Sequence, residues 1–338
     1  MSRADRDGAT VATHAPGRVN LIGDHTDYMG GLALPMAVDL GTTVRGRVGG
    51  TRLRLRSEGF EDVLDVELPV TDPAVVTPTW GRYAAGVAAE LGTRRGLDGT
   101  VTSTVPAGGG LSSSAALEVA VALALGAPDD PVELADLCRR AETAATGVPC
   151  GIMDQLCSVA GVAGHALLID CATLEVTPVR IPDEAAIWVV DPGEPRALAG
   201  SAYAERRATC EAAAEVVGPL PHADMSAIES LDDPVLRARA RHVRTECDRV
   251  RGAAAALTAG DLVRAGELMV ESHRSLAEDF EVSTPGLDRA VEELMGLLGV
   301  YGARLTGAGF GGNVVALARP DAVLPGRRVR PSEGARLL

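Results

Sequence analysis

The chain has 338 residues, of which 46% are hydrophobic and 23% charged, as in an ordinary globular protein. Its 32 basic residues are all arginine and its acidic residues number 46, so the formal net charge is −14. This balance argues against general nucleic-acid or anionic-membrane binding, which favours a basic face, but it does not exclude an anionic nucleotide.

The sequence predicts a cytoplasmic protein. No apolar run approaches the roughly 20 residues that span a bilayer, and the polar N-terminus has no signal-peptide core. The six cysteines lie at irregular spacings without a C-x-x-C pair, which favours reduced thiols over a zinc site or a disulfide framework. We expect no nucleic-acid or membrane partner, and a monomer.

The N-terminal region predicts a strand at residues 10–14 and then a structured loop at residues 15–31, APGRVNLIGDHTDYMGG. Loops on a rigid scaffold often carry binding residues. The polar side chains of this one can hydrogen-bond a polyhydroxylated substrate from several sides: Arg18, Asn20, Asp24, His25, Asp27 and Tyr28. The alternative is a solvated turn in which Asp24 and Asp27 act as caps.

Four β-like runs follow, at residues 32–38, 42–48, 51–57 and 63–69. Clear alternation in TRLRLRS predicts one antiparallel sheet with a polar face. Residues 79–91 read as a helix with Trp80 and Tyr83 on one stripe. That stripe indicates core packing or, alternatively, an aromatic face beside a purine.

A loop that opens a helix occupies residues 108–116, GGGLSSSAA, after a predicted strand that ends at Pro106. Glycines let the backbone approach a ligand closely, and a helix N-terminus offers free N–H groups and a partial positive charge to a phosphate. One serine hydroxyl could ligate Mg²⁺. The stretch lacks the Walker-loop pattern. The alternative to phosphate binding is a turn with an N-cap.

The second half of the chain predicts a helix from Pro131, a break at residues 146–156, and a new helix that begins near Asp154. There Asp154 is either a cap or a group that faces a substrate hydroxyl. A β pair at 165–180 and a strand at 186–191 precede a helical region from Ser201. The tail contains a second glycine-rich loop at residues 305–312, either a hinge or a ligand-closing loop.

This order of elements predicts an α+β architecture with two lobes and a cleft between them. We place the N-terminal lobe at residues 1–180 and the C-terminal lobe at residues 181–338.

Five motifs in order resemble the GHMP family of small-molecule kinases, and the first resembles its galactokinase branch. They are GRVNLIGDHTDYMGG, VPAGGGLSSSAALEVA, GVPCGIMDQL, RALAGSAYAERRATCE and LTGAGFGGNVVAL. The resemblance implies the two-lobed GHMP kinase fold, with a mixed α/β N-terminal lobe, a helical, ferredoxin-like C-terminal lobe and the active site in the cleft. It also implies that ATP, with Mg²⁺, phosphorylates the anomeric hydroxyl of galactose.

The resemblance also implies roles for individual residues. Arg18 and Asp154 match the catalytic pair, and Ser114 with Glu142 matches the metal ligands, although the sequence leaves open which loop serine holds the ion. The sugar site corresponds to Asp24, His25, Asp27, Gly151 and Tyr203. The nucleotide site corresponds to Gly108, Gly110, Ser112, Ser113 and Ser114, with Trp80 as the residue beside the purine.

Four departures from the family pattern stand out. Asp24 replaces a usual glutamate, residues 191–198 lack a usual Asn and His, and Asn313 replaces a common cysteine. The link before the last strand is short, so a usual helix is expected to be missing. The first two departures motivate an alternative, a 1-kinase for L-arabinose, galacturonate or N-acetylgalactosamine. A second alternative is a catalytically silent, sugar-responsive binding protein.

Overall fold

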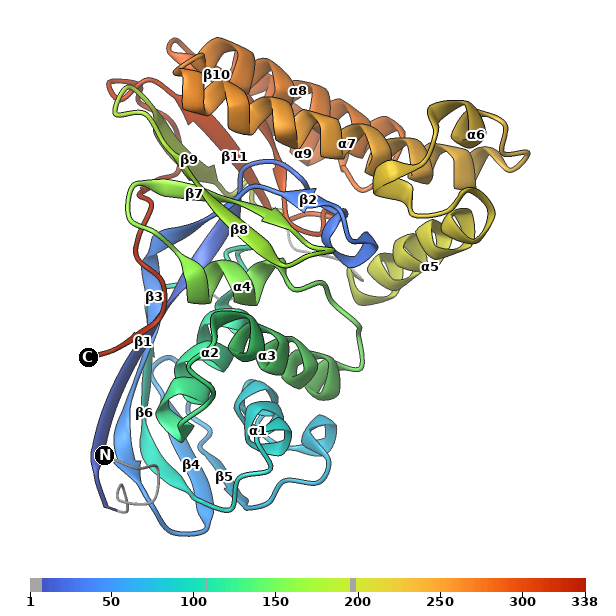
Figure 1. The fold of residues 1–338 in the computed structure, drawn as a ribbon. Coiled ribbons are helices and arrows are strands. Elements are labelled where there is room, and N and C mark those ends of the chain that lie inside the picture. The colour runs from blue at the N-terminus through green and yellow to red at the C-terminus, as the bar shows by residue number, and fades with distance from the viewer. Residues whose placement is uncertain (1–7, 107, 195–198) are drawn as a thin grey trace.

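The computed structural model describes residues 8–106, 108–194 and 199–338 (Figure 1). Its lower part in Figure 1 is a large sheet covered on one face by helices, and its upper part is a smaller sheet under long helices. A third, small sheet lies between them. This is the predicted α+β class.

The large sheet has the strand order β13-β1-β3-β6-β4-β5. Its strands are β1 (Thr10–Asn20), β3 (Pro35–Val48), β4 (Arg52–Ser57), β5 (Leu64–Glu67), β6 (Leu97–Ser103) and β13 (Arg336–Leu337). Arginines of β4 alternate outward with buried leucines, so the predicted polar face is confirmed. The prediction of a purely antiparallel sheet was wrong, because the chain crosses over through a helix after β5 and inserts β6 parallel to β4.

Strand β1 is longer than predicted. Residues 15–20 were expected to begin a loop, but they continue the ladder with β3 across a register shift between Pro16 and Arg18. The glycine and proline that indicated a loop instead accompany an irregularity of the strand. The true loop begins at Leu21 and contains the 3-10 helix η2 (Asp27–Met29).

Helices α1 to α4 cover one face of the large sheet (Figure 1). They are α1 (Gly81–Glu90), α2 (Ser113–Leu125), α3 (Pro131–Thr146) and α4 (Met153–Ala160), with the short η3 (Pro73–Val75) before α1. Asp130 caps α3 by accepting from the N–H groups of Val132 and Glu133, and Pro131 occupies its first turn, as predicted. Helix α2 is buried along nearly its whole length.

The small middle sheet has the order β2-β7-β8, with β2 (Leu32–Ala33), β7 (His165–Asp170) and β8 (Glu175–Arg180). The predicted pairing of β7 with β8 is confirmed. The run at residues 32–38 was expected in one sheet with its successors, but it divides at Leu34. Its first part pairs with β7, and the rest continues into β3.

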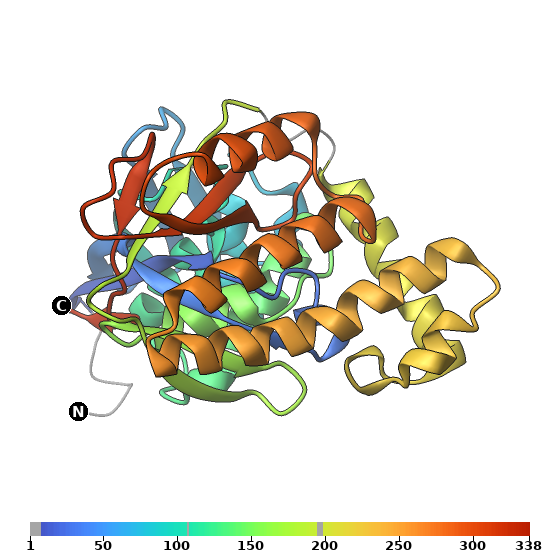
Figure 2. The ribbon, with the colours of Figure 1, turned by 90° about the horizontal axis from the view of Figure 1, so that it is seen from above.

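The upper sheet has the order β10-β11-β9-β12, with β9 (Ala186–Val190), β10 (Val300–Thr306), β11 (Asn313–Ala318) and β12 (Arg327–Val329). The helical region contains α5 (Ala199–Val217), η4 (Leu220–His222), α6 (Met225–Glu229), α7 (Pro234–Ala259), α8 (Leu262–Glu278) and α9 (Pro285–Met295). Figure 2 shows α7 and α8 side by side across the top of the molecule.

The C-terminal segment joins the two parts. It descends from the upper sheet in Figure 1 and pairs with β1 through β13. Residues 319–326 form turns and irregular chain, in keeping with the short link that the sequence predicts there. One buried cluster also joins the parts, because it contains Val19 and Leu111 from below and Val250 and Leu268 from above. The lobe boundary near residue 180 stays a prediction.

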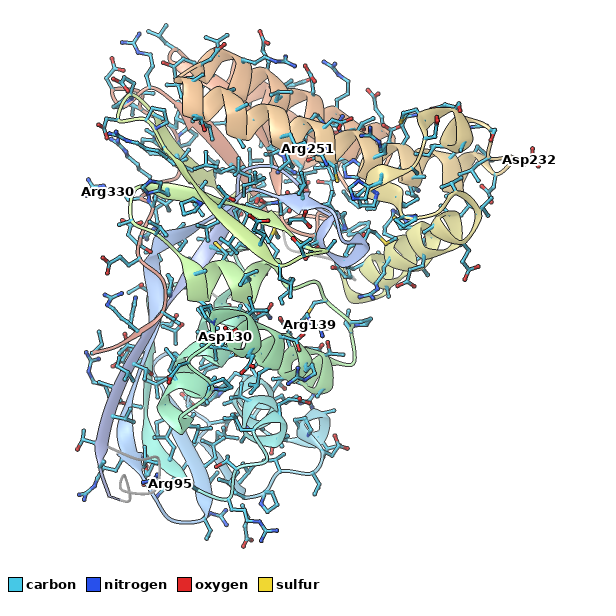
Figure 3. All side chains as sticks on the ribbon, in the orientation of Figure 1. Arg95, Asp130, Arg139, Asp232, Arg251 and Arg330 are labelled. Atoms are coloured by element: carbon cyan, nitrogen blue, oxygen red, sulfur yellow. The ribbon has the colours of Figure 1, made fainter. Side chains whose placement is uncertain are left out.

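The outer surface is strongly charged. Asp232, Arg251 and Arg330 are exposed at its periphery (Figure 3). All six cysteines are free thiols, as predicted. Across the described ranges, no helix is both long and apolar enough to cross a membrane.

Close packing of α8 on β10 predicts that alanine substitutions at two glycines differ in their effect on the stability of the fold. A Cβ at Gly266 would lie 2.2 Å from the carbonyl oxygen of Tyr301, whereas a Cβ at Gly252 in α7 would meet the flexible end of Leu268 at 3.1 Å. We expect Gly266→Ala to lower the free energy of unfolding by about 1–3 kcal/mol through overpacking. Gly252→Ala should change it by less than about 1 kcal/mol, because better helix propensity offsets the contact. Urea denaturation of both variants measures this, and equal losses would contradict it.

Candidate active site

A cavity of about 750 Å³ lies where β1, the start of α2, α4 and the glycine loop after β10 meet. Every residue to which the family resemblance assigned a role lines it. They are Arg18, Asp24, His25, Asp27, Trp80, Gly108, Gly110, Ser112, Ser113, Ser114, Glu142, Gly151, Asp154 and Tyr203. Asn20 and Tyr28, which the sequence analysis also named in the polar loop, are not among its lining residues. Tertiary structure therefore brings together residues that are up to 185 positions apart in sequence, from Arg18 to Tyr203 (203 − 18).

Arg18 and Asp154 form a bidentate ion pair at the centre of the cavity. Nε of Arg18 donates to Oδ1 of Asp154 at 2.6 Å, and Nη2 donates to Oδ2 at 2.5 Å. The Arg18 side chain is 7% exposed and that of Asp154 is 27% exposed. Burial alone would lower the pKa of Arg18, but the adjacent Asp154 outweighs it and raises that pKa. The pair presents a fixed cation and carboxylate to a ligand.

The phosphate loop, residues 108–114, is attached directly to Arg18. The Arg18 guanidinium donates to the carbonyl of Gly110 at 2.7 Å, and its backbone N–H donates to the carbonyl of Leu111 at 3.1 Å. A Cβ at Gly17 would lie 2.5 Å from that Leu111 oxygen. Only glycine therefore permits this approach of β1 to the loop.

The loop turns into α2 through left-handed backbone. Gly108, Gly110 and Ser112 have φ of 73°, 69° and 54°, and Ser112 precedes the first helical residue without capping it by its side chain. Its hydroxyl instead donates to Asp154. The N-terminus of a long buried helix thus opens onto the cavity, where its N–H groups and dipole favour an anion.

Ser114 and Glu142 place two side-chain oxygen groups side by side on the cavity wall. The Ser114 hydroxyl hydrogen-bonds the Glu142 carboxylate, and Nε2 of Gln155 donates to Oε2 of Glu142 at 2.6 Å. Burial, followed by the charge of Asp154, raises the pKa of Glu142. A carboxylate held beside a hydroxyl fits Mg²⁺, which commonly takes one or two carboxylates and completes its shell with phosphates and water.

Asp27 faces the cavity across Gly151. A Cβ at Gly151 would lie 1.7 Å from Oδ2 of Asp27, so this position requires glycine. Burial, with the nearby charge of Asp154, raises the pKa of Asp27 to about 6. A carboxylate with two acceptor oxygens in such a place is suited to bind sugar hydroxyls.

Asp24 is 2% exposed, and its two oxygens are engaged within the protein. Oδ1 accepts from the N–H of Gly307 at 3.0 Å, and Oδ2 lies 2.5 Å from Nη2 of the fully buried Arg304. The shorter side chain that replaces the usual glutamate is therefore anchored to the upper sheet at its cavity end.

His25 is a neutral hydrogen-bonding group at the cavity wall. Burial lowers its pKa to about 4, and its ring nitrogens contact the hydroxyl of Tyr28 at 3.1 Å and the carbonyl of Ala308 at 3.2 Å. The ring packs against Tyr203 and Phe280, with centroids 5.5 and 4.7 Å away. Its backbone is left-handed, with φ of 63°, which the surrounding contacts hold in place.

Aromatic side chains line another part of the cavity wall. Trp80 stacks on Phe60 with centroids 5.9 Å apart, and Tyr83 lies on the same lining. Phe60 is 50% exposed. Trp80 itself is partly buried. A stacked aromatic pair on the wall of this cavity is suited to a purine.

Sequence reasoning missed several contributors. Gln155 was overlooked although it follows Asp154, and Phe60 gave only the weak signal of an aromatic in a loop. Asn313 was noted only as a departure, but its amide donates to the carbonyl of Gly109 and so joins the second glycine-rich loop to the phosphate loop. Residues 191–194 are described, and Glu194 accepts from Thr284. Residues 195–198, the rest of that departure, lie outside the described residues.

The fold and this cavity define a small-molecule kinase of the GHMP class. Residues 81–162 and 253–325 match the GHMP kinases N-terminal and C-terminal domains, and residues 3–48 match the galactokinase galactose-binding signature. The galactokinase of Chloroflexus aurantiacus is 44% identical over 93% of this chain and 85% of the relative. The human galactokinase is 44% identical over 92% and 84%. The chain belongs to the galactokinase family.

Solved structures agree in fold. The Lactococcus lactis galactokinase complexed with galactose superposes with a TM-score of 0.91 at 30% identity, covering 97% of this chain and 95% of that one. A mevalonate kinase from Methanococcus jannaschii superposes with a TM-score of 0.69 at 19% identity, over 96% and 99% of the chains. The second likeness concerns the fold alone.

The raised pKa of Asp27 predicts a pH-dependent effect on stability. A folded-state pKa near 6 against a model-peptide value of 3.8 means that ionised Asp27 destabilises the fold above pH 6, and that the penalty vanishes below about pH 4. Asp27→Asn, which is neutral throughout, should raise the free energy of unfolding by about 1–3 kcal/mol at pH 7–8 and lose that advantage between pH 6 and pH 4.

Denaturant titrations across pH 4–8 measure this difference. Asp183→Asn removes an exposed carboxylate outside the cavity and controls for the substitution. A stability difference that stays constant across the whole range would contradict the assignment.

Proposed function

We propose that this protein transfers the γ-phosphoryl group of ATP to the anomeric hydroxyl of galactose, forming galactose 1-phosphate and ADP. The observation that carries the proposal is the bidentate Arg18–Asp154 pair, placed between the N-terminus of α2 and the carboxylate of Asp27 in one cavity. The family relatives that share this fold are galactokinases.

ATP would bind with its purine at Trp80 and its phosphates on the glycine and serine loop. Gly108, Gly110, Ser112 and Ser113 would offer backbone N–H groups there, since the Ser112 hydroxyl already donates to Asp154. Mg²⁺, when bound between Ser114 and Glu142, would neutralise charge on the phosphates. Because the chain contains no lysine, the cation that the protein itself supplies is an arginine, whose planar fork suits phosphate oxygens.

Galactose would bind on the opposite side of the Arg18–Asp154 pair. Asp27 supplies acceptors, Tyr203 and neutral His25 supply a wall, and the backbone at Gly151 allows close approach. We place Asp24 in the same sugar site as a wall residue, since its two oxygens are already engaged.

Transfer requires alignment of the anomeric hydroxyl with the γ-phosphorus and stabilisation of the charge on the transferring oxygens. Asp154 would accept the hydroxyl proton as the new P–O bond forms and the bond to the leaving ADP oxygen breaks. Arg18 fixes that carboxylate with two hydrogen bonds and places positive charge beside the transferring group. Ser112 holds the same carboxylate from the phosphate-loop side.

An ATP-consumption assay of the purified protein with Mg²⁺ tests the proposal directly. The sugars are galactose, 2-deoxygalactose, N-acetylgalactosamine, galacturonate, L-arabinose and glucose. We expect clear preference for galactose. Turnover of another sugar with little on galactose would overturn the substrate and retain the chemistry. Binding without turnover of any sugar would indicate a sugar-responsive binding protein.

Substitution of Asp154 distinguishes sugar binding from phosphoryl transfer. Asp154→Asn should keep the galactose dissociation constant within a few-fold, while kcat falls by about 10²–10⁴-fold, the usual contribution of a positioned base. Asp136→Asn, which disrupts a surface Arg–Asp pair on α3, is the matched control and should retain kcat. Equilibrium dialysis and steady-state kinetics measure the two quantities, and a nearly intact kcat in Asp154→Asn would remove its assigned role.

A further inference from the structure

The sugar-binding loop, residues 21–31, is held from behind by helix α7. The backbone N–H of Gly23 donates to Oε1 of Glu246 at 2.9 Å. The carbonyl of the following residue, Asp24, accepts from Nε2 of His242 at 3.1 Å. Two side chains one helical turn apart thus bind the backbone of two consecutive loop residues, and neither side chain lines the cavity.

Glu246 is fully buried and completely partnered. Besides Gly23, its Oε1 accepts from the hydroxyl of Ser272 in α8 at 2.5 Å, and its Oε2 accepts from Nε of Arg249 at 2.7 Å. Burial alone would raise the pKa of Glu246, but the charge of Arg249 and other nearby cations outweighs it and lowers that pKa to about 2. A charged carboxylate therefore accepts from the loop N–H. Such a charge-assisted hydrogen bond is stronger than one to a neutral acceptor.

His242 is held in one tautomer by its partners. The Asp24 carbonyl can only accept, so Nε2 carries the proton. Burial lowers the pKa of His242 to about 3, so the ring is neutral, and Nδ1 lies 2.9 Å from the hydroxyl oxygen of Ser275. Its ring also packs on Phe280, 4.6 Å between centroids, and Phe280 packs in turn on His25 of the loop.

The loop backbone at Gly23 leaves no room for a side chain. Gly23 has φ of 99°, a conformation open mainly to glycine. A Cβ there would approach the Leu32 carbonyl at 2.7 Å and the Val250 side chain at 2.8 Å. The loop thus lies between α7 and β2, and the polar contacts of α7 hold the backbone of Gly23 and Asp24, while other contacts hold the Asp24 and His25 side chains.

We propose that Glu246 and His242 are positioning residues for the sugar site, which fix the Gly23–Asp24 backbone and through it the sugar-facing wall. Neither residue itself lines the cavity, so they act through the loop. The phosphate loop and Arg18 are held by other contacts, which β1 and Asn313 make. The proposal rests on the proposed galactokinase function.

The test is whether a variant weakens the binding of galactose and leaves the binding of ATP unchanged. Glu246→Gln removes the charge that binds Gly23 and Arg249 while keeping the size of the side chain. We expect the KM and dissociation constant for galactose to rise about 5–20-fold, with the KM for ATP within about two-fold. Ser272→Ala, which removes one donor to Glu246, should shift galactose in the same direction by a smaller factor.

Glu267→Gln is the matched control, because Glu267 is exposed and pairs with Arg264 on the surface of α8. It should change neither constant. Equal changes for galactose and ATP, or none in a variant that melts like the unaltered protein, would overturn the proposal. If Glu246→Gln does not fold, Ser272→Ala decides alone by the same comparison. Failure of the proposed function itself is distinct, because the unaltered protein would then not phosphorylate galactose.

Discussion

The bidentate pair between Arg18 and Asp154 is the interaction on which the functional architecture depends. It joins the C-terminal end of β1 to the first turn of α4, and the same guanidinium donates to the Gly110 carbonyl of the phosphate loop. Separating two largely buried opposite charges would leave each uncompensated, which typically destabilises a protein by about 3–5 kcal/mol. Three elements distant in sequence are therefore locked around one point, and that point faces the reacting groups.

Two kinds of contact support this centre from opposite sides. On the nucleotide side, backbone approaches backbone closely at Gly17, so the phosphate loop rests directly on β1. On the sugar side, buried side chains of α7, α8 and β10 hold the loop: Glu246, His242, Ser272 and Arg304. In the mechanism that we propose, the contacts of β1 hold the phosphate loop, and those of α7, α8 and β10 hold the loop that we assign to the sugar.

Much of the fold was predictable from local pattern. Pro131 after Asp130 marks a helix start, and the alternation in TRLRLRS marks a half-buried strand, because capping and pleating involve residues close in sequence. The continuation of β1 to Asn20 was missed, since its evidence lies in pairing with β3 some 15 to 27 positions away, from Asn20↔Pro35 (35 − 20) to Ala15↔Thr42 (42 − 15). The parallel placement of β6 beside β4 was missed for the same reason: strand order is a property of the assembled sheet.

The sequence by itself determined the chemical types available for catalysis. Its motifs identified a glycine and serine loop before a helix, an arginine in place of any lysine, and carboxylates spaced for a polyhydroxylated ligand. Tertiary structure decided which of those groups face the cavity and which are engaged elsewhere. Asp24 and Asp27 lie three positions apart and both line the cavity, yet Asp24 is bound by Arg304 and Gly307, whereas burial raises the pKa of Asp27. That difference arises from packing against β10 and Gly151, whose distance along the chain hides it from any local pattern.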